Sequence, residues 1–266
     1  MSTSPSSKPI ALVTGASAGI GMELARLLAV DHDLILTARR GDQLHALAAE
    51  VKQAHNATCH VFPVDLGDPR SPRQLFDAIT AAGFTVDVLV NNAGFGDLGS
   101  FAQADLAKAL RMIQVNITAL TELTGLFLPL MVARKRGRIL NVGSVAGFQA
   151  GPLMAVYYAT KAYVNSFSEA LHSELRRTGV TVTVLCPGPV ATEFAQVAGM
   201  QTTRAFSAGQ PMSARAVAEA GLRALHAGRR MVVPGWRNRL MLFLERITPR
   251  GVVIRVVKWM MQRRVQ

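Results

Sequence analysis

Ile10-Ala11-Leu12-Val13-Thr14-Gly15-Ala16-Ser17-Ala18-Gly19-Ile20-Gly21 decides the fold. Its first four residues are apolar, which suits a short buried parallel strand. From Met22 to Leu28, after the glycines, apolar residues recur with helical spacing. A strand, a glycine turn and a helix form a phosphate-binding unit, because glycines let backbone approach a phosphate and the helix N-terminus offers free N–H groups. The candidate phosphate contacts are Gly15, Ser17, Ala18, Gly19, Ile20 and Gly21.

The spacing of this turn is G-x-x-x-G-x-G, and no Gly-Lys-Ser/Thr follows it. A nucleotide-triphosphate P-loop is therefore excluded. Taken alone, the turn could equally be a plain structural turn. The sequence around it has to decide.

The next apolar run, which ends in Ala38-Arg39-Arg40, bears on which dinucleotide would bind. NAD sites carry an acidic residue near this point, where it binds the ribose 2′-hydroxyl. Here Ala38 stands instead, and the guanidinium groups of Arg39 and Arg40 suit a 2′-phosphate. Ser17 could donate a further hydrogen bond. NADP(H) is predicted over NAD(H); the alternative, that both arginines merely face solvent, leaves the missing acid unexplained.

A tyrosine and a lysine lie four residues apart in Tyr157-Tyr158-Ala159-Thr160-Lys161, thirteen residues after Ser144. Positions i and i+4 share one helix face, which puts the Tyr157 phenol beside a cation. A phenol has a pKa near ~10, and a nearby positive charge lowers it toward the range that acid–base catalysis needs. Ser144 ends an apolar run, where its hydroxyl could hold a carbonyl oxygen. By itself the pair could be an ordinary helix-surface pair.

Together these motifs resemble the short-chain dehydrogenases/reductases, in their single-domain branch. The resemblance covers residues 10 to about 195, and its motifs occur in the family's order. They are Thr14-Gly15-Ala16-Ser17-Ala18-Gly19-Ile20-Gly21, Val64-Asp65-Leu66, Asn91-Asn92-Ala93-Gly94, Asn116, Ser144, Tyr157 with Lys161, and Pro187-Gly188-Pro189-Val190-Ala191-Thr192.

The resemblance implies the roles of the remaining site residues. Asp65 would meet the adenine, with Leu66 beside it in the cofactor site. The cofactor cleft would be lined by Asn91, Asn92, Ala93 and Gly94, with Ile117 nearby, and the nicotinamide bordered by Pro187, Gly188, Val190 and Thr192.

The family's chemistry then follows for the reacting groups. Tyr157 would give a proton to a carbonyl oxygen that Ser144 holds, while NADPH delivers hydride. Lys161 would lower the Tyr157 pKa and bind the nicotinamide ribose. Asn116 would kink its helix and hold a water that returns protons, although a buried Asn more often satisfies backbone.

Strand-like and helix-like segments alternate along the chain, which predicts an α/β fold. We expect a Rossmann-like doubly wound parallel sheet of about seven strands with helices on both faces. A polar leader at 1–8 would precede one catalytic domain at 9–228, which includes a substrate loop at 188–213. The last strand and a basic tail would occupy 229–266. The expected strands are Ile10–Thr14, Leu34–Ala38, Thr58–Val64, Val86–Asn91, Arg138–Gly143, Val180–Cys186 and Met231–Val233.

The expected substrate is an apolar ketone, aldehyde or acyl carbonyl, since apolar residues gather near the expected pocket, although each could be ordinary packing. They are Phe95, Phe148, Pro152, Leu153, Met154, Phe194, Met200 and Phe206. The alternative is a sensor or scaffold that binds NADP(H) without turnover; the complete set of reacting groups favours an enzyme. Two unpaired cysteines and the lack of an apolar leader predict a cytoplasmic protein. No metal-ligand spacing is recognisable, and the resemblance implies a homodimer or homotetramer.

Charge is concentrated at the C-terminus. Residues 229–266 hold ten basic residues and one acid, Glu245, and so carry nine of the chain's twelve net positive charges. Trp236, Leu240, Phe243, Leu244 and Ile247 share one helical face there. Such a tail could cover the enzyme's own pocket or a neighbouring subunit, or it could dock peripherally on an anionic membrane through 236–264. Its apolar runs are too short to span a membrane, and the sequence contains no recognisable nucleic-acid-binding module.

Overall fold

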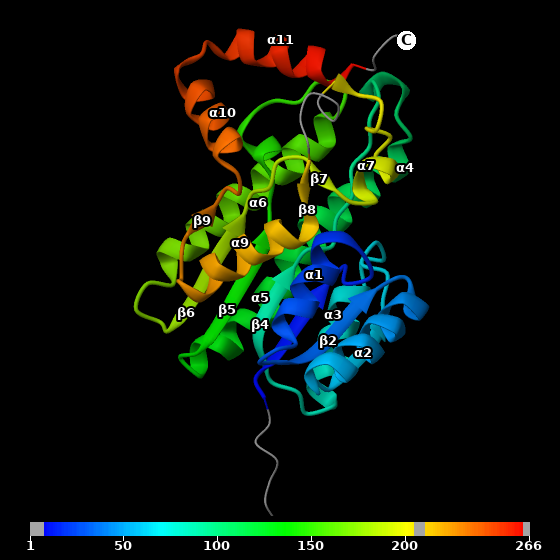
Figure 1. Ribbon diagram of the computed structural model, residues 1–266, viewed down its shortest axis with the longest axis vertical. Helices are drawn as coiled ribbons and strands as arrows, with labels where there is room; N and C mark the ends of the chain where they lie inside the picture. The colour runs from blue at the N-terminus through cyan, green and yellow to red at the C-terminus, as the bar shows by residue number, and fades with distance from the viewer. Residues whose placement is uncertain (1–7, 205–210, 263–266) are drawn as a thin grey trace, which may run out of the picture.

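The described residues, 8–204 and 211–262, form a seven-stranded parallel sheet in a computed structural model of the chain (Figure 1). The strand order is β3-β2-β1-β4-β5-β6-β9. The strands of this sheet are β1 Ile10–Thr14, β2 Asp33–Ala38, β3 Cys59–Pro63, β4 Val86–Asn91, β5 Gly137–Val142, β6 Val180–Leu185 and β9 Met231–Val232. The predicted doubly wound α/β fold is confirmed, and each strand boundary lies within one residue of its prediction.

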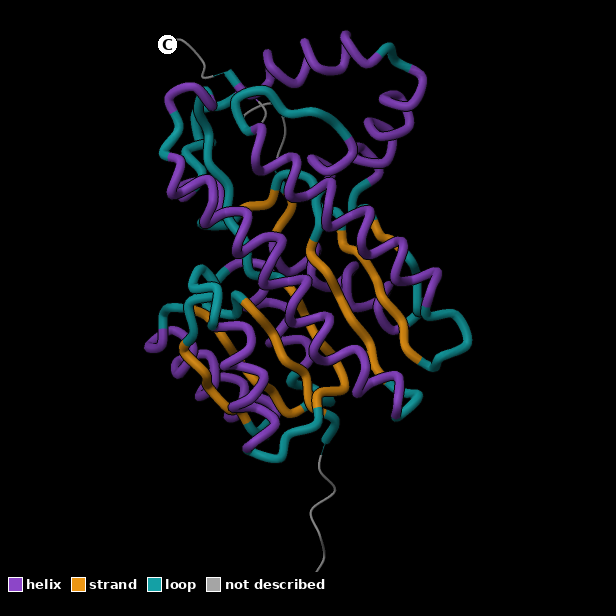
Figure 2. Tube along the Cα trace, turned by 180° about the vertical axis from the view of Figure 1, so that it is seen from behind, coloured by secondary structure: helices purple, strands orange, loops and turns teal. Residues whose placement is uncertain are grey.

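Helices cover both faces of this sheet (Figure 2). Alternate strand residues divide between two cores, as the period of a strand requires. Leu34 and Leu36 pack with one set of helices and Ile35 with the other. The first set is α1 Gly19–Leu28, α2 Gly41–His55 and α9 Ala214–His226; the second is α3 Ser71–Ala81, α5 Leu120–Ala133 and α6 Ala155–Glu174.

The remaining elements lie mostly near the carboxyl ends of the strands. A short parallel pair that the sequence did not predict, β7 Val190–Ala191 and β8 Met212–Ser213, lies within the predicted substrate loop. The other elements are the turns η1 Phe101–Gln103 and η3 Val145–Phe148, the π-helix η2 Gln114–Ala119, and the helices α4 Leu106–Ile113, α7 Phe194–Val197, α10 Trp236–Ile247 and α11 Arg250–Met261.

One helical run, Leu106–Ala133, is long and apolar enough to cross a membrane by length and composition alone, with a mean hydropathy of 1.5. In the structure Leu123, Phe127 and Met131 of this run are buried against the sheet. That packing is typical of a core helix.

Some predicted segments lie outside the described residues. These are residues 1–7 of the leader, 205–210 of the substrate loop with Phe206, and 263–266 of the tail. The division of the chain at residue 228 stays a prediction.

Candidate active site

A cavity of about 420 Å³ opens at the carboxyl ends of the strands, where the strand order reverses between β1 and β4. Open α/β sheets bind ligands at such a switch point. Except for Gly21, Asn91, Asn116 and Ile117, the predicted site residues all line this cavity. They are Gly15, Ser17, Ala18, Gly19, Ile20, Arg39, Arg40, Asp65, Leu66, Asn92, Ala93, Gly94, Ser144, Tyr157, Lys161, Pro187, Gly188, Val190 and Thr192.

The glycine turn between β1 and α1 brings backbone to the cavity. Gly15 has a φ of +65°, and a Cβ there would lie 2.8 Å from Asn92 Nδ2 and 2.9 Å from Ala93 Cα. Helix α1 starts at Gly19, three residues earlier than its pattern indicated, and its first residues Gly19 and Ile20 line the cavity. This cradle fits the phosphates of a dinucleotide.

Gly21 has a different task from the one predicted. It is buried, and a Cβ there would lie 2.3 Å from Asn92 Nδ2 and 2.4 Å from the Gly15 carbonyl oxygen. Gly21 therefore permits close packing of α1 under the turn, and it does not line the cavity.

Arg40 lies at one edge of the cavity with its guanidinium beside the glycine turn. Its Nε and Nη2 donate to Ser17 Oγ at 3.4 and 3.3 Å, and Nη2 lies 2.9 Å from Glu193 Oε2. Glu193 follows β7, so this ion pair joins the two edges of the cavity mouth. Because a guanidinium binds phosphates as well as carboxylates, Arg40 is a candidate ligand of a 2′-phosphate at this edge.

The structure separates the two asparagines that the resemblance placed together at the cleft. Asn91 is buried, and its Nδ2 donates to Thr124 Oγ1 at 3.0 Å and to Asn141 Oδ1 at 2.9 Å. Its side chain therefore lies in the core. Asn92 lines the cavity and donates to the carbonyl oxygens of Thr14 and Gly15 at 2.9 and 3.1 Å, which fixes the glycine turn.

Two further expectations near the cleft concern Ile117 and Asp65, and their contacts with the cofactor stay predictions. The cavity wall includes Val115 and not Ile117. Asp65 lines the cavity, as expected, but its carboxylate is also engaged: Oδ1 accepts from the Gly67 N–H at 2.9 Å and Oδ2 pairs with Arg111 of α4.

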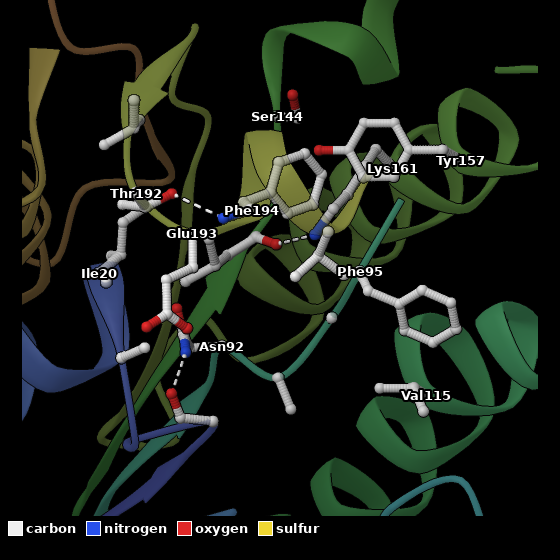
Figure 3. Close-up of a pocket in the computed structure, with 18 of the residues that line it drawn as sticks. Ile20, Asn92, Phe95, Val115, Ser144, Tyr157, Lys161, Thr192, Glu193 and Phe194 are labelled. Atoms are coloured by element: carbon white, nitrogen blue, oxygen red, sulfur yellow. Dashed lines mark hydrogen bonds between the residues drawn. The ribbon is translucent and has the colours of Figure 1, made fainter. Parts of the chain in front are cut away.

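Ser144, Tyr157 and Lys161 meet at the centre of the cavity (Figure 3). Strand β5 delivers Ser144 just past its carboxyl end, and the first turns of α6 carry Tyr157 and Lys161. Ser144 Oγ accepts from the Ala146 N–H at 3.0 Å, donates to the Pro187 carbonyl oxygen at 3.4 Å, and is the hydrogen-bonding neighbour of the Tyr157 hydroxyl. Lys161 Nζ donates to the Val142 carbonyl oxygen at 2.7 Å.

The pKa of Tyr157 moves opposite to the sequence-based expectation. Burial raises the pKa of the Tyr157 phenol to about 12, with the Ser144 hydrogen bond acting weakly the other way. Burial lowers the pKa of Lys161 to about 8. Lys161 Nζ is bonded to Val142 and lies 5.9 Å from the centroid of the Tyr157 ring, so desolvation outweighs charge in this structure.

Asn116 acts from behind the cavity. It lies in η2, a π-helical turn that interrupts the run from α4 to α5, in agreement with the expected distortion. Its Nδ2 donates to the Phe95 carbonyl oxygen at 3.0 Å and to Thr160 Oγ1 at 3.1 Å, while Oδ1 accepts from the Phe95 N–H at 3.1 Å. Asn116 thereby ties the segment after β4 to the turn of α6 that carries the reacting groups.

The side of the cavity beyond Tyr157 is apolar. Four of the predicted pocket residues, Phe95, Met154, Phe194 and Met200, line it, and the ring of Phe194 lies 5.3 Å from that of Tyr157. Phe148, Pro152 and Leu153 do not line the cavity, and Leu153 packs beside it with Met154 and Tyr157.

Arg111, Glu193 and Met261 are among the lining residues that went unpredicted. Glu193 directly follows Thr192, and its position beside that motif was the available signal. Arg111 and Met261 reach the cavity only through tertiary packing. Among residues 8–204 and 211–262, no group of three or more His, Cys, Asp or Glu side chains could hold a metal.

Comparison with known proteins identifies the class that this fold and site define. The family model described as short chain dehydrogenase matches residues 9–203. The chain therefore belongs to the short-chain dehydrogenase family, and the predicted family and enzyme class are confirmed.

Three similar proteins place the chain within that family. It is 39% identical over 191 residues to sulfoacetaldehyde reductase 2 of Chromohalobacter salexigens, covering 71% of this chain and 75% of the relative. It is 34% identical over 180 residues to the ketoacyl reductase HetN of Nostoc sp., covering 68% and 63% respectively, so it spans less than two thirds of that relative. A short-chain dehydrogenase from Sphingobium yanoikuyae, solved in complex with NADPH, is 30% identical with a TM-score of 0.80, covering 92% of this chain and 95% of that one.

Proposed function

We propose that this protein is an NADP(H)-dependent carbonyl reductase that acts on an apolar ketone, aldehyde or acyl carbonyl. The observation that carries the proposal is the meeting of Ser144, Tyr157 and Lys161 in one cavity, between a phosphate-binding turn and an apolar wall. The NADPH in the Sphingobium structure and the ketoacyl reductase activity named for the Nostoc relative support it. So does a very-long-chain 3-oxoacyl-CoA reductase of Anas platyrhynchos, 35% identical over 196 residues, of which the chain spans 61%.

The residues present fit NADP(H) as the cofactor. The backbone of the glycine turn and the N-terminus of α1 would hold the pyrophosphate. Arg40, Arg39 and Ser17 would bind the 2′-phosphate, in exchange for the contact that Arg40 now makes with Glu193. When bound, the nicotinamide supplies the hydride.

The chain's own groups would manage the oxygen and its proton. Ser144 would hold the carbonyl oxygen and stabilise the negative charge that develops on it. Tyr157, which its raised pKa keeps protonated at neutral pH, would donate the proton to that oxygen. Lys161 would place a positive charge beside the phenolate that forms, and Asn116 would hold Phe95 and α6 in position. Proton return through a water on Asn116 stays a prediction.

The site is also expected to work in a homo-oligomer in the cytoplasm. Leu106, Leu110 and Ile113 on α4 expose apolar side chains, which is consistent with a subunit contact. Both cysteines, Cys59 and Cys186, are free, as in a reducing compartment.

Oxidation of NADPH, followed by absorbance against ketones, aldehydes and 3-oxoacyl compounds with NADH in parallel, tests this function. Replacing Tyr157 by Phe should lower kcat at least about a hundredfold and leave NADPH binding within about twofold, because only proton donation is lost. Tyr158→Phe is the matched control, since it removes a buried hydroxyl one residue away. Wild-type turnover in Tyr157→Phe would overturn the assignment. Tight NADPH binding without turnover of any substrate would favour the sensor alternative.

A further inference from the structure

The outward surface of the last two helices is apolar and open to solvent. We refer to residues 236–261, which form α10 and α11, as the C-terminal arm. Figure 1 shows α10 leaving β9 and α11 crossing one end of the molecule. No residue of α10 is buried. The large apolar residues exposed on the arm are Trp236, Leu240, Phe243, Leu244, Ile247, Val252, Val256 and Trp259.

These residues form a continuous stripe along each helix and are not scattered singly over the surface. On α10 they recur at the spacing of one helix face, and Phe243 and Ile247 are 61% and 68% exposed. On α11, Val252, Val256 and Trp259 also recur at the spacing of one helix face. Contiguous exposed apolar surface of this kind marks a contact site.

Positive charge borders both stripes. The arm carries six basic residues, all exposed: Arg237, Arg239, Arg246, Arg250, Arg255 and Lys258. Its one acid, Glu245, is half-buried, and burial raises the pKa of its carboxyl. The outward surface therefore combines apolar stripes with cations alone. Arg237 also lies over the Trp236 ring, 5.5 Å from its centroid.

The arm is held to the rest of the protein by its opposite side. Val257 and Met261 are 4% and 5% exposed and pack with Met154 and Tyr158 of the cavity wall. At the start of α10, Asn238 donates to the Pro234 carbonyl oxygen at 2.7 Å and packs against Gly188. These contacts fix which sides of α10 and α11 face outward, and that outward surface is not the pocket lid.

Charge decides what the outward surface fits. A second copy of the chain would bring two cationic surfaces together without an acid between them, which is unfavourable. A single-stranded nucleic acid would need stacking aromatics along a basic groove, and aliphatic residues occupy most of these stripes. An anionic lipid surface satisfies both features, because apolar side chains enter the headgroup boundary while Arg and Lys meet lipid phosphates. Tryptophans at the edges of such a contact are typical.

We propose that the C-terminal arm docks the protein peripherally on an anionic lipid membrane through the apolar stripes and basic borders of α10 and α11. The inner face of the same arm lines the apolar end of the cavity through Met261, so docking would bring that end close to the bilayer. The docking does not depend on the proposed reaction.

Co-sedimentation of the full-length protein with vesicles tests the docking. We expect binding to phosphatidylcholine vesicles that contain about one third phosphatidylglycerol, at least tenfold weaker binding to pure phosphatidylcholine, and release in high salt. Phe243→Glu combined with Ile247→Glu should abolish binding. Arg237→Gln combined with Arg246→Gln should weaken it about tenfold or more, since each basic residue near the surface contributes about fivefold.

Val30→Glu is the control, because Val30 is 59% exposed and lies outside the C-terminal arm, so this variant should bind vesicles like the wild type. Thermal unfolding and NADPH binding, measured on every variant, show that the fold and cofactor site are intact. Loss of NADPH binding in the wild type would count against the proposed function and not against the docking.

Three results would overturn the docking: no vesicle binding by the wild type, equal binding to neutral vesicles, or full binding by the Phe243/Ile247 variant. A stable oligomer that the same variant dissociates would show that a second copy occupies this surface instead.

Discussion

The sheet with its cavity and the C-terminal arm use similar residue types in opposite ways. In the sheet region, polar side chains are buried in pairs: Asn91 bonds to Asn141, and Asn141 in turn donates to Ser168 Oγ at 2.9 Å. In the arm, apolar side chains are exposed between arginines. The family model ends at residue 203, before the arm begins. The family motifs therefore account for the catalytic region. The role of the arm has to be inferred from the residues that it exposes.

Glycine-to-alanine substitutions should give the largest difference in stability between the two regions. Gly15→Ala places a Cβ within 3 Å of Asn92 and Ala93 at a left-handed φ. We expect the free energy of unfolding to fall by about 2–4 kcal/mol and the NADPH Kd to rise about a hundredfold, because the turn must move away from the phosphates. Thermal unfolding and an NADPH titration measure both.

Gly251→Ala, in the arm, is the matched control. Nothing lies within 4 Å of a Cβ at Gly251, and α11 begins at the preceding residue, so alanine should stabilise the helix by up to about 1 kcal/mol. Equal responses at the two glycines would show that the turn tolerates a side chain and would remove the structural basis for the phosphate cradle.

The catalytic region could be predicted in detail because its signals are local. Each strand is a short apolar run bounded by turn residues, and the motifs at the strand ends meet wherever parallel strands end together. Such reasoning locates Tyr157, Lys161 and Ser144 at one cavity. It cannot distinguish the neighbours Asn91 and Asn92, since their environments depend on whether each lies inside the strand or just beyond it.

Electrostatics inside the cavity could not be predicted from spacing. The four-residue interval places Lys161 near Tyr157, but the Lys161 ammonium bonds to the backbone of Val142, at the end of β5. Whether charge or desolvation dominates depends on burial, which is a property of the whole fold. The same holds for Met261, since no motif connects the end of the chain with the cavity that it lines.

The pH dependence of reduction gives the next largest effect and probes that buried interior. Burial lowers the pKa of Lys161 to about 8, while Tyr157 and Cys186, both with pKa values raised to about 12, stay neutral. The charged lysine is therefore lost as pH rises through about 8. With a ketone that does not titrate, kcat/KM for reduction should be level below pH 8 and fall about tenfold per pH unit above it.

Lys161→Arg provides the comparison for this profile, because a guanidinium stays charged throughout. If this variant retains measurable activity, its profile should be flat above pH 8. A wild-type profile that is flat to about pH 10 would mean that Lys161 keeps its proton, and that the interior of the cavity is less dry than its burial indicates.

The smallest expected effect is a difference in stability between substitutions on the two faces of α11. One face of this helix packs against the rest of the protein and the other is exposed. Val257 is 4% exposed and packs with Met154 and Tyr158, while its neighbour Val256 is 48% exposed. Val257→Ala should lower the free energy of unfolding by about 1.5–2.5 kcal/mol, through lost apolar burial and a small cavity. It should also raise the KM for an apolar ketone several-fold, because the wall that Met261 completes would loosen. Val256→Ala removes the same two methyl groups from the outward face and should change stability by less than about 0.5 kcal/mol. Thermal unfolding and steady-state kinetics on both variants test this difference. Equal losses of stability would mean that α11 is covered on both faces. No loss of stability and no change in KM in either variant would mean that the arm does not close the cavity.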